Sequence, residues 1–473
     1  MSGLFGVASE SNCMDPLFYG TDYHSHLGTE FAGAAIQDNQ VHREIHRISH
    51  GQFKNLFDDF YHGYSGGMGL GVISDSDPQP IVIRSRFGVF TIVTAGLVTN
   101  LDALGLESLA KGVTFSETTD GRFNQAEVVA KIIAGGKNIV VGIEEVFARL
   151  DGSLSLLLMT QDKIYAACDP GGRLPLTLAS RAGTVAVASE TCAFPNLGLE
   201  IRKFVEPGEI ISFDSSGIKD VAATRAKKQV CSFLWVYTGY PASSYHGVSV
   251  ETVRERCGQA LARKDHVCAD FASGVPDSGT GHAIGYAMES KLPFRRPLVK
   301  YSAGYGRSYT PPSQDVRDRI AKMKLIPIAD IARGNRIVVC EDSIVRGTQL
   351  RNLTIQKLWD AGAVEVHIRV ACPPLMFPCR YSLSTRSIDE LAARRAIRAL
   401  NGRDLKDVSA YIAPEMEQHR EMVEWIRKDL NCTSLIYLTL EEMVKAIGLS
   451  QADLCTWCWD GCVGENLKQA IGV

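Results

Sequence analysis

The segment from residue 337 to residue 360 constrains the fold of this chain more than any other. Its first four residues, Ile337-Val338-Val339-Cys340, are apolar and typical of a buried parallel strand. Gly347 lies in the short loop that follows and permits a backbone turn that few other residues allow. From Gln349 to Asp360, apolar residues recur at helical spacing. The segment therefore predicts a strand, a tight loop and a helix, which together form the repeating unit of a parallel α/β sheet.

The predicted loop carries groups suited to a phosphate and a sugar. Free N–H groups at the start of a helix, with the hydroxyls of Ser343 and Thr348, can form a nest for a dianionic phosphate. The adjacent carboxylates of Glu341 and Asp342 can hold sugar hydroxyls or a magnesium ion. A phosphorylated ribose satisfies both requirements. The alternative for so short a motif is a solvated strand end followed by an ordinary glycine turn.

Composition excludes some classes of partner. The chain has 473 residues and a formal net charge of -3, with 50 basic and 53 acidic residues, so no broad cationic field is expected for nucleic acid or an anionic membrane. No apolar run approaches the roughly 18 residues that span a bilayer, and no signal peptide is recognisable. The 13 cysteines are an odd number, which argues against a secreted disulfide framework. We therefore expect a cytoplasmic protein without nucleic-acid or membrane partners.

The hydrophobic pattern divides the chain near residue 230. Before it, short apolar segments such as Met68 to Ile73 and Ser153 to Met159 predict stacked antiparallel sheets, with a helix at Ala126 to Ile133. The polar, basic stretch Ala222 to Gln229 is interpreted as a linker. Beyond it, strand and helix patterns alternate, which predicts a parallel sheet, and the charged segment Ser384 to Lys428 predicts two more helices outside the core.

The stretch Glu341 to Thr348 resembles the phosphoribosyl pyrophosphate (PRPP) signature of phosphoribosyltransferases, in the form found in glutamine PRPP amidotransferases. The resemblance implies an α+β domain of the N-terminal nucleophile hydrolase type at 1–230. It implies an α/β phosphoribosyltransferase domain with a parallel sheet at 231–473. It also implies a homo-oligomer, either a dimer or a tetramer.

Further segments carry the resemblance around the sugar-phosphate site. Asp277, Ser278 and Gly279 resemble the family's pyrophosphate loop, Lys300 and Arg307 its mobile loop with a spacing one residue longer, and Lys324 the Lys of a Lys-Leu pair. The resemblance assigns PRPP binding to Asp277, Ser278, Gly279, Lys300, Glu341, Asp342, Ser343, Arg346, Gly347 and Thr348, and Mg to Ser278, Glu341 and Asp342.

The implied reaction is displacement of pyrophosphate from the anomeric carbon by an amine. Charge builds on the leaving oxygens, so Mg and basic side chains would stabilise the transition state, with Arg307 and Lys324 in catalytic positions. No protein nucleophile is required for this step.

Four cysteines resemble the ligands of the family's iron-sulfur branch. Cys455 and Cys458 form a Cys-x-x-Cys pair that could also bind zinc or cycle as a dithiol. Cys231 opens a Cys-x-Phe segment and Cys379 follows a proline, as in that branch. The resemblance implies a structural 4Fe-4S cluster on these four thiolates, with Cys462 as a possible substitute. The remaining cysteines are expected to be buried thiols: Cys13, Cys168, Cys192, Cys257, Cys268, Cys340, Cys372 and Cys432.

The first residues, Ser2 to Val7, resemble the start of a glutamine amidotransferase, with Ser2 in place of the family's catalytic cysteine. A serine can act as an N-terminal nucleophile. However, Ser74 stands where an Arg would bind the glutamine carboxylate, Ala95 where an Asn would complete the oxyanion hole, and Gln125 where an Asp would hold the ammonium. Losing one oxyanion donor alone typically costs about 3 to 4 kcal/mol, so we expect a retained fold without glutaminase activity.

Three functions therefore remain open. The first is an amidophosphoribosyltransferase-like enzyme that transfers free or partner-supplied ammonia to C1 of ribose 5-phosphate. The second is a glutamine-dependent enzyme that uses Ser2. The third is a PRPP-sensing regulatory protein without catalysis, for which the chain offers no basic recognition helix.

Overall fold

The computed structural model describes residues 1–223, 226–301, 323, 325–381, 385 and 387–462. The chain divides into two compact units. The first comprises residues 1–231, 242–246 and 380–384, and the second residues 232–241, 247–379 and 385–473. The predicted domain boundary at 230/231 remains a prediction.

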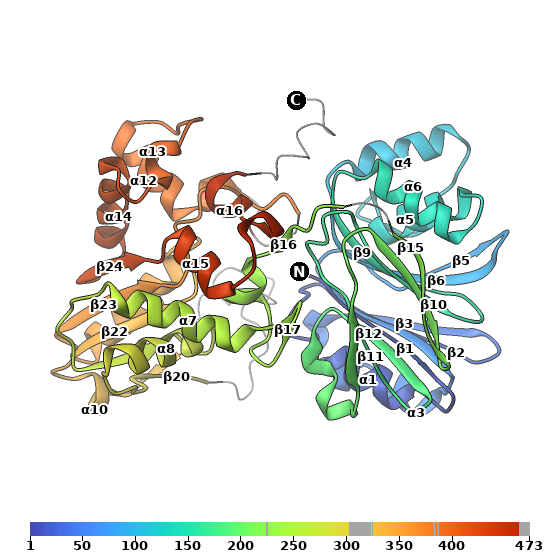
Figure 1. The fold of residues 1–473 in the computed structure, drawn as a ribbon, viewed down its shortest axis with the longest axis horizontal. Helices are drawn as coiled ribbons and strands as arrows, with labels where there is room; N and C mark the ends of the chain where they lie inside the picture. Colours follow the sequence, from blue (N-terminus) through green and yellow to red (C-terminus); the bar gives the residue numbers. More distant parts are fainter. Residues whose placement is uncertain (224–225, 302–322, 324, 382–384, 386, 463–473) are drawn as a thin grey trace. The chain divides into compact units, whose positions relative to one another are not determined.

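The first unit is built on two antiparallel sheets (Figure 1). One sheet has the order β13 (Glu200–Phe204), β11 (Thr177–Arg181), β12 (Thr184–Ala188), β1 (Gly3–Ser9), β4 (Met68–Ser74), β2 (Phe31–Gln37) and β3 (Val41–Arg47). The other has the order β15 (Gly217–Ala223), β14 (Glu209–Asp214), β10 (Ile164–Cys168), β9 (Gly152–Met159), β6 (Gly88–Val98) and β5 (Ile81–Ser85).

Apolar side chains join these sheets into layers. Leu4 and Val72 of one sheet and Leu157 of the other belong to a single buried cluster. On its outer face, each sheet packs against helices: α1 (Met14–Asp22), α2 (Phe53–Leu56) and α3 (Asp58–Gly63) on the first, and α4 (Leu101–Ala110), α5 (Gln125–Gly135) and α6 (Ile139–Arg149) on the second. The stacked antiparallel sheets expected from the sequence are confirmed.

The linker interpretation of Ala222 to Gln229 is wrong at its start. Ala222 and Ala223 are the last residues of β15, where they pair with Ile210 and Glu209 of β14. β15 lies at the edge of its sheet and none of its residues is fully buried, so its last residues lack the apolar pattern that marks a central strand.

The second unit contains a four-stranded parallel sheet of order β19 (Phe271–Gly274), β22 (Arg336–Glu341), β23 (Glu365–Val370) and β24 (Ser434–Tyr437). The helices α7 (Val250–Arg263) and α8 (Thr280–Ser290) pack together, and α8 contacts β19 and β22. The predicted helix after the loop is present as a π-helical turn, η5 (Leu350–Ile355), that continues into α11 (Gln356–Asp360). The predicted strand, loop and helix are therefore confirmed.

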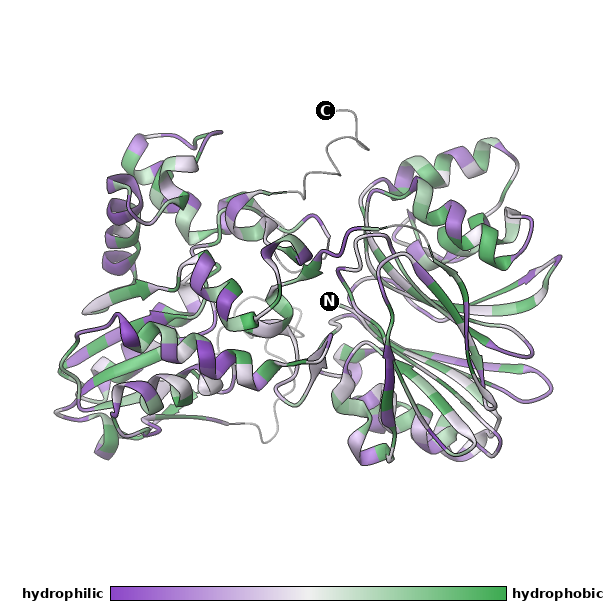
Figure 2. Cartoon of the chain, viewed as in Figure 1, coloured by the Kyte–Doolittle hydropathy of each residue, from purple (hydrophilic) through white to green (hydrophobic). Residues whose placement is uncertain are grey.

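The remaining elements lie around this sheet. A short pair of strands, β20 (Leu298–Lys300) and β21 (Leu325–Pro327), precedes α10 (Ala329–Ala332). The charged segment forms α12 (Ala392–Asn401) and α14 (Glu417–Leu430), with the single turn α13 (Ser409–Ile412) between them. Of these helices, α14 is mostly hydrophilic (Figure 2). The chain continues through α15 (Leu440–Ile447) to α16 (Trp457–Asp460).

The expectation that Cys268 is buried is wrong. The thiol of Cys268 is exposed and accepts a hydrogen bond from Arg336 at 3.1 Å, because the segment after α7 runs over the surface before it enters β19. The other seven cysteines predicted to be buried are buried.

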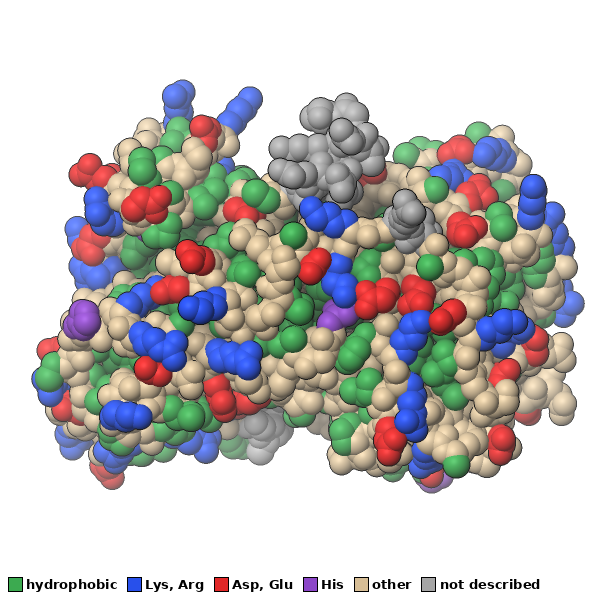
Figure 3. All heavy atoms as spheres, in the orientation of Figure 1, with side chains coloured by type: hydrophobic (Ala, Val, Ile, Leu, Met, Phe, Trp, Pro, Cys, Tyr) green, Lys and Arg blue, Asp and Glu red, His purple; other side chains and the backbone are tan. Residues whose placement is uncertain are grey.

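Two features bear on possible partners. No described helix is long and apolar enough to cross a membrane. On the face drawn in Figure 3, acidic and basic side chains are interspersed.

Candidate active site

Two loops meet at the carboxyl edge of the parallel sheet. The first follows β19 and contains Asp277, Ser278 and Gly279, and the second follows Glu341, the last residue of β22, and begins at Asp342. The N–H of Val275 donates to the carbonyl of Cys340 at 3.0 Å, which ties the first loop to the end of β22. A Cβ on Gly279 would lie 2.2 Å from the Cys340 oxygen, so glycine is needed for this close approach. Ligands of open α/β sheets bind at this edge.

The acidic pair predicted from the sequence lies within this edge. Glu341 and Asp342 are buried, with 8% and 3% of their surfaces exposed. The Ser278 hydroxyl donates to Glu341 at 3.3 Å, and the Ser343 hydroxyl donates to Asp342 at 2.6 Å. Burial, and then the charge of Asp342, raise the pKa of Glu341 well above its usual range. Two adjacent buried carboxylates are costly unless a cation or hydroxyl groups compensate them.

The second loop has the backbone of a phosphate nest. Gly347 has a φ of +75°, a left-handed conformation that glycine adopts without strain. The helix begins directly after it, since the N–H of Arg351 donates to the Gly347 carbonyl at 2.9 Å. Neither the Arg346 nor the Gly347 N–H has an acceptor among the described residues. These groups can therefore donate to an anion.

Two cationic side chains of the predicted site are described. Lys300, at the end of β20, donates to Asp277 of the first loop at 2.6 Å. Arg346, in the second loop, pairs with Glu390 at 2.5 Å. The side chain of Thr348 is at the surface, at the start of the helix. The two predicted catalytic residues Arg307 and Lys324 lie outside the described residues.

The edge supplies a donor set suited to magnesium. The oxygen atoms of Glu341, Asp342 and Ser278 are hard ligands, and Mg²⁺ is commonly bound by one or two carboxylates with substrate oxygens and waters completing the shell. Among the described residues, no group of three or more His, Cys, Asp or Glu side chains forms a metal site by itself. Two carboxylates beside a phosphate nest still fit a magnesium ion that arrives with a phosphorylated ligand.

The first unit places the predicted glutamine-pocket residues close together. Ser2 Oγ, 8% exposed as a residue, accepts a hydrogen bond from the Asp75 N–H at 3.0 Å. Ser74 is buried, and its hydroxyl accepts from the Gln79 amide at 3.4 Å. Ala95 is buried on β6 and offers no side-chain donor.

Two glutamine side chains link this pocket internally. The Gln79 amide accepts from the Thr94 N–H at 2.7 Å and donates to the Thr94 carbonyl at 3.2 Å. Gln125 accepts from the Val98 N–H at 2.9 Å and donates to the Gly96 carbonyl at 3.4 Å. The described polar groups along this part of β6 are thus bonded within the protein.

Gln79 was missed by the sequence interpretation. The sequence carries no local signal for it, because its role depends on β6, which passes beside it only in the folded domain. The residues of segment 388–395 that contact the second loop were also missed, because they lie near that loop only in the folded domain.

The cysteines predicted as cluster ligands have neighbours that bond one another. The N–H groups of Met376 and Phe377 donate to the Cys458 carbonyl at 2.9 and 3.1 Å. The Trp457 indole donates to the carbonyl of Pro378, which precedes Cys379, at 2.8 Å. The hydroxyl of Ser232, which follows Cys231, donates to the Cys455 carbonyl at 3.0 Å.

Comparison with known proteins agrees with this architecture. A glutamine amidotransferase domain family matches residues 70–196. The chain is 32% identical to the amidophosphoribosyltransferase of Methanocaldococcus jannaschii over 98% of this chain and 97% of that protein. It is 29% identical to the amidophosphoribosyltransferase of Bacillus subtilis over 99% of this chain and 94% of that protein.

Comparison with solved structures agrees with the sequence comparison. The chain superimposes on the glutamine PRPP amidotransferase of B. subtilis, complexed with ADP and GMP, with a TM-score of 0.83. The two are 28% identical, with 97% of this chain and 96% of that chain covered. A second structure, described as the allosteric regulatory enzyme of purine biosynthesis, also has a TM-score of 0.83 and 28% identity, with 97% of this chain and 95% of that chain covered. With near-complete coverage, a matching domain family and a shared fold, this chain belongs to the amidophosphoribosyltransferase family.

Proposed function

We propose that this chain is an amidophosphoribosyltransferase of purine biosynthesis that binds PRPP with Mg and transfers an amine to C1 of the ribose, releasing pyrophosphate. The observation that carries the proposal is the buried pair Glu341 and Asp342 beside a loop whose Arg346 and Gly347 N–H groups have no acceptor within the described parts of the chain. The carboxylates orient the ribose hydroxyls and, with Ser278, hold the magnesium ion. The nest of Ser343, Arg346, Gly347 and Thr348 binds the 5'-phosphate.

The pyrophosphate end of the substrate is assigned to the first loop and to cations. Asp277, Ser278 and Gly279 lie at the same edge of the sheet as Glu341, and Lys300 is held beside them by Asp277. When bound, magnesium neutralises charge on the leaving oxygens. Arg307 and Lys324 are proposed to stabilise the same charge as the bond to the anomeric carbon loosens.

The proposed amine donor is ammonia, free or delivered by a partner protein. The support comes from the first unit, where Gln79 and Gln125 use their amides on the backbone of β6. Gln125 therefore does not present a carboxylate to a substrate ammonium, and Ser74 does not present a cation to a substrate carboxylate. A free glutamine would have to displace these internal bonds without charged partners to replace them.

One assay separates the possible donors. Purified protein is incubated with PRPP, Mg and either ammonium or glutamine, and release of pyrophosphate and of glutamate is followed. We expect pyrophosphate with ammonium and none with glutamine. Glutamate release that is abolished by Ser2→Ala would overturn the ammonia proposal in favour of a glutamine-dependent enzyme. PRPP binding without pyrophosphate release from either donor would indicate a PRPP sensor.

We also propose a structural 4Fe-4S cluster on Cys231, Cys379, Cys455 and Cys458. The support is that residues adjoining these cysteines are hydrogen-bonded to one another. Four thiolates are the ligand set such a cluster needs.

Iron and acid-labile sulfide in anaerobically purified protein test the cluster. We expect a broad visible absorption band that is lost in Cys458→Ser and kept in Cys268→Ser, because the Cys268 thiol is exposed and bonded to Arg336. Equal iron content in both variants would refute the assignment. The proposed compartment is the cytoplasm, in keeping with the odd number of cysteines, 13, which argues against a secreted disulfide framework. The proposed assembly is a dimer or tetramer, which sedimentation would measure.

A further inference from the structure

The loop proposed to bind the 5'-phosphate is held from behind by the segment that enters α12. The N–H of Ala392, the first residue of α12, donates to the Val345 carbonyl at 2.7 Å. The Arg395 guanidinium, one turn further on, donates to the Arg346 carbonyl at 3.1 Å. Two successive carbonyls of the loop therefore point towards α12.

This contact fixes the direction of the loop amides. In a trans peptide the C=O and N–H groups point in opposite directions. When the Val345 and Arg346 carbonyls are bonded to α12, the N–H groups of Arg346 and Gly347 must point to the other side of the loop. These are the two N–H groups that have no acceptor among the described residues. Gly347, with its φ of +75°, lets consecutive N–H groups converge on one anion.

Further contacts hold the bracing segment itself. Asp429 of α14 accepts from Arg395 at 2.9 Å and from Arg351, in the helix after the loop, at 3.2 Å. Glu390 pairs with the Arg346 side chain. The guanidinium of Arg395 is therefore fixed between α14 and the loop backbone.

We propose that Arg395 and the first N–H of α12 are positioning groups for phosphate recognition. They hold two consecutive loop carbonyls so that the opposite amides form a preorganised cradle for the 5'-phosphate of a phosphorylated sugar. This inference rests on the proposed function and adds to it a role for α12, which lies outside both substrate loops. Without the contacts from Ala392 and Arg395, the loop amides would have to become ordered when the phosphate binds, which lowers the affinity.

Ala392→Pro tests the backbone contact. Proline is favoured at the first position of a helix, where its missing N–H leaves the helix intact. Leu391, the preceding residue, has φ -73° and ψ 124°, which is compatible with a following proline. The substitution thus keeps α12 but removes the donor to Val345 and places the ring Cδ against that carbonyl, which must turn away. We expect at least about a three- to tenfold loss of affinity, the usual range for one lost hydrogen bond.

Arg395→Ala and Arg395→Lys test the side-chain contact. We expect Arg395→Ala to weaken binding of ribose 5-phosphate and of PRPP with Mg by about tenfold, and Arg395→Lys to restore part of it. In the pyrophosphate assay, KM for PRPP should rise with kcat nearly unchanged, since the brace acts on binding. Arg263→Ala is the control with the same loss of charge, because Arg263 pairs with Glu289 on α8.

The outcomes separate the inference from the function on which it rests. Calorimetry measures binding of ribose 5-phosphate and PRPP, and thermal unfolding confirms that each variant is folded. If Arg395→Ala fails to fold, the affinities of Ala392→Pro and Arg395→Lys test the inference instead. If the unchanged protein binds PRPP and the folded variants bind it equally well, the inference is overturned and the function stands. If the unchanged protein binds neither ligand, both are overturned.

Discussion

Single residues set the geometry of the candidate site. Gly279 lets the first loop approach the end of β22, Gly347 turns the second loop, and Asp342 is buried where the second loop begins. Each position admits few side chains, for a different reason: space at Gly279, backbone conformation at Gly347, and charge at Asp342. Substitutions at these positions therefore distinguish steric effects on the site from effects of charge.

Gly279→Ala is expected to destabilise the second unit and to impair PRPP binding. Its Cβ would lie 2.2 Å from the Cys340 oxygen and 2.7 Å from the Val275 nitrogen, so backbone must move at about 1 to 3 kcal/mol. Urea unfolding measures the change. Gly135→Ala is the control, since nothing lies within 4 Å of its Cβ and alanine has a higher helix propensity than glycine at this last residue of α5. Equal stability of the two variants would contradict the steric argument.

Asp342→Asn is expected to reduce PRPP affinity by about ten- to a hundredfold while the protein stays folded. The side chain keeps its shape but loses the charge that accepts ribose hydroxyls or binds magnesium, and charged hydrogen bonds are worth more than neutral ones. Calorimetry with Mg present checks this. Asp360→Asn, at the end of α11 where the carboxylate contacts Gln356, should bind PRPP normally. Unchanged affinity in Asp342→Asn would refute the role of the acidic pair.

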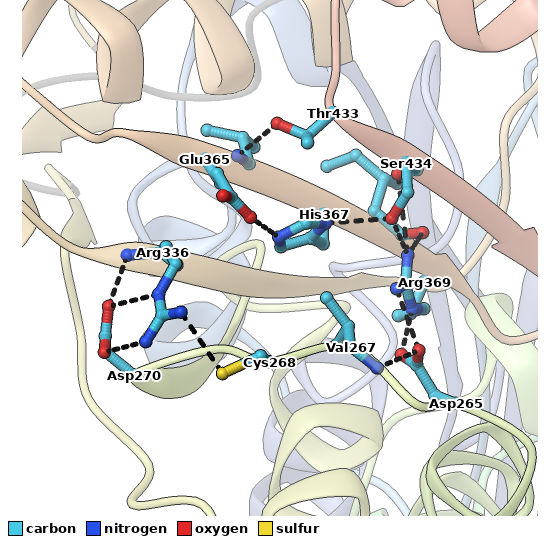
Figure 4. A network of polar contacts seen from close by, with 12 residues as sticks. Asp265, Val267, Cys268, Asp270, Arg336, Glu365, His367, Arg369, Thr433 and Ser434 are labelled. Atoms are coloured by element: carbon cyan, nitrogen blue, oxygen red, sulfur yellow. Dashed lines mark hydrogen bonds and ion pairs between the residues drawn. The ribbon is translucent and has the colours of Figure 1, made fainter.

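At the scale of elements, a buried ion pair fastens helices to the parallel sheet (Figure 4). Arg369 on β23 pairs with Asp265, which follows α7, and their side chains are 1% and 3% exposed. Tyr286 of α8 donates to the same carboxylate at 2.6 Å. Burial alone would raise the pKa of Asp265, but the hydrogen bonds and charge of Arg369 outweigh it and hold the pKa below its usual value. The pair thereby connects α7 and α8 to β23. Helix α8 begins directly after the first loop of the candidate site.

Asp265→Asn is expected to lower the free energy of unfolding at neutral pH by about 3 to 5 kcal/mol, because Arg369 would remain buried without a counter-charge. Asp265→Asn combined with Arg369→Met should recover much of that loss. Glu289→Gln, which removes the partner of the exposed Arg263, should cost at most about 1 kcal/mol. Denaturant titrations compare the variants, and similar losses from Asp265→Asn and Glu289→Gln would contradict the assignment.

The same pair predicts a pH dependence. The folded pKa of Asp265 lies below the unfolded value, so its contribution is complete above the unfolded pKa of about 4 and is lost as pH falls through the folded pKa. The unfolding free energy should therefore decline less steeply in acid for Asp265→Asn than for the unchanged protein. Equal acid slopes would show that another carboxylate is responsible.

At the scale of the whole molecule, the two units correspond to different parts of the proposed function. The second unit contains the proposed PRPP site, with the acidic pair and the N–H groups of the second loop. The first unit keeps the antiparallel scaffold matched by the glutamine amidotransferase domain family, and its candidate pocket is bonded internally. We therefore expect the donor to enter as ammonia.

The rate of pyrophosphate release at a fixed total ammonium concentration should rise from neutral to alkaline pH. Neutral ammonia is the nucleophile, and its fraction grows as the ammonium ion loses its proton. Initial rates with saturating PRPP and Mg measure this, and PRPP binding at each pH is the control. A rate independent of pH over that range, with binding intact, would argue against free ammonia as the attacking species.

The local units of this protein follow from its sequence. The apolar run before Glu341, the glycine of the loop and the helical spacing after it predicted β22, the turn and the helix, because these depend on neighbours within a few residues. The resemblance of both loops to family motifs further predicted that their residues belong to one PRPP site. The exposed Cys268 and the extension of β15 to Ala223 were not predicted, since both depend on how distant segments pack.

In contrast, the distant groups that support the site could be identified only in the folded protein. Arg395 lies 49 residues from Arg346 in the chain, and Gln79 lies 15 residues from Thr94, yet each side chain bonds the backbone of its distant partner. Nothing local distinguishes Arg395 from the other arginines of α12, because a side chain gains its role from the carbonyl that folding places beside it. Local periodicity fixes elements, whereas hydrogen bonds between elements exist only after the core has packed.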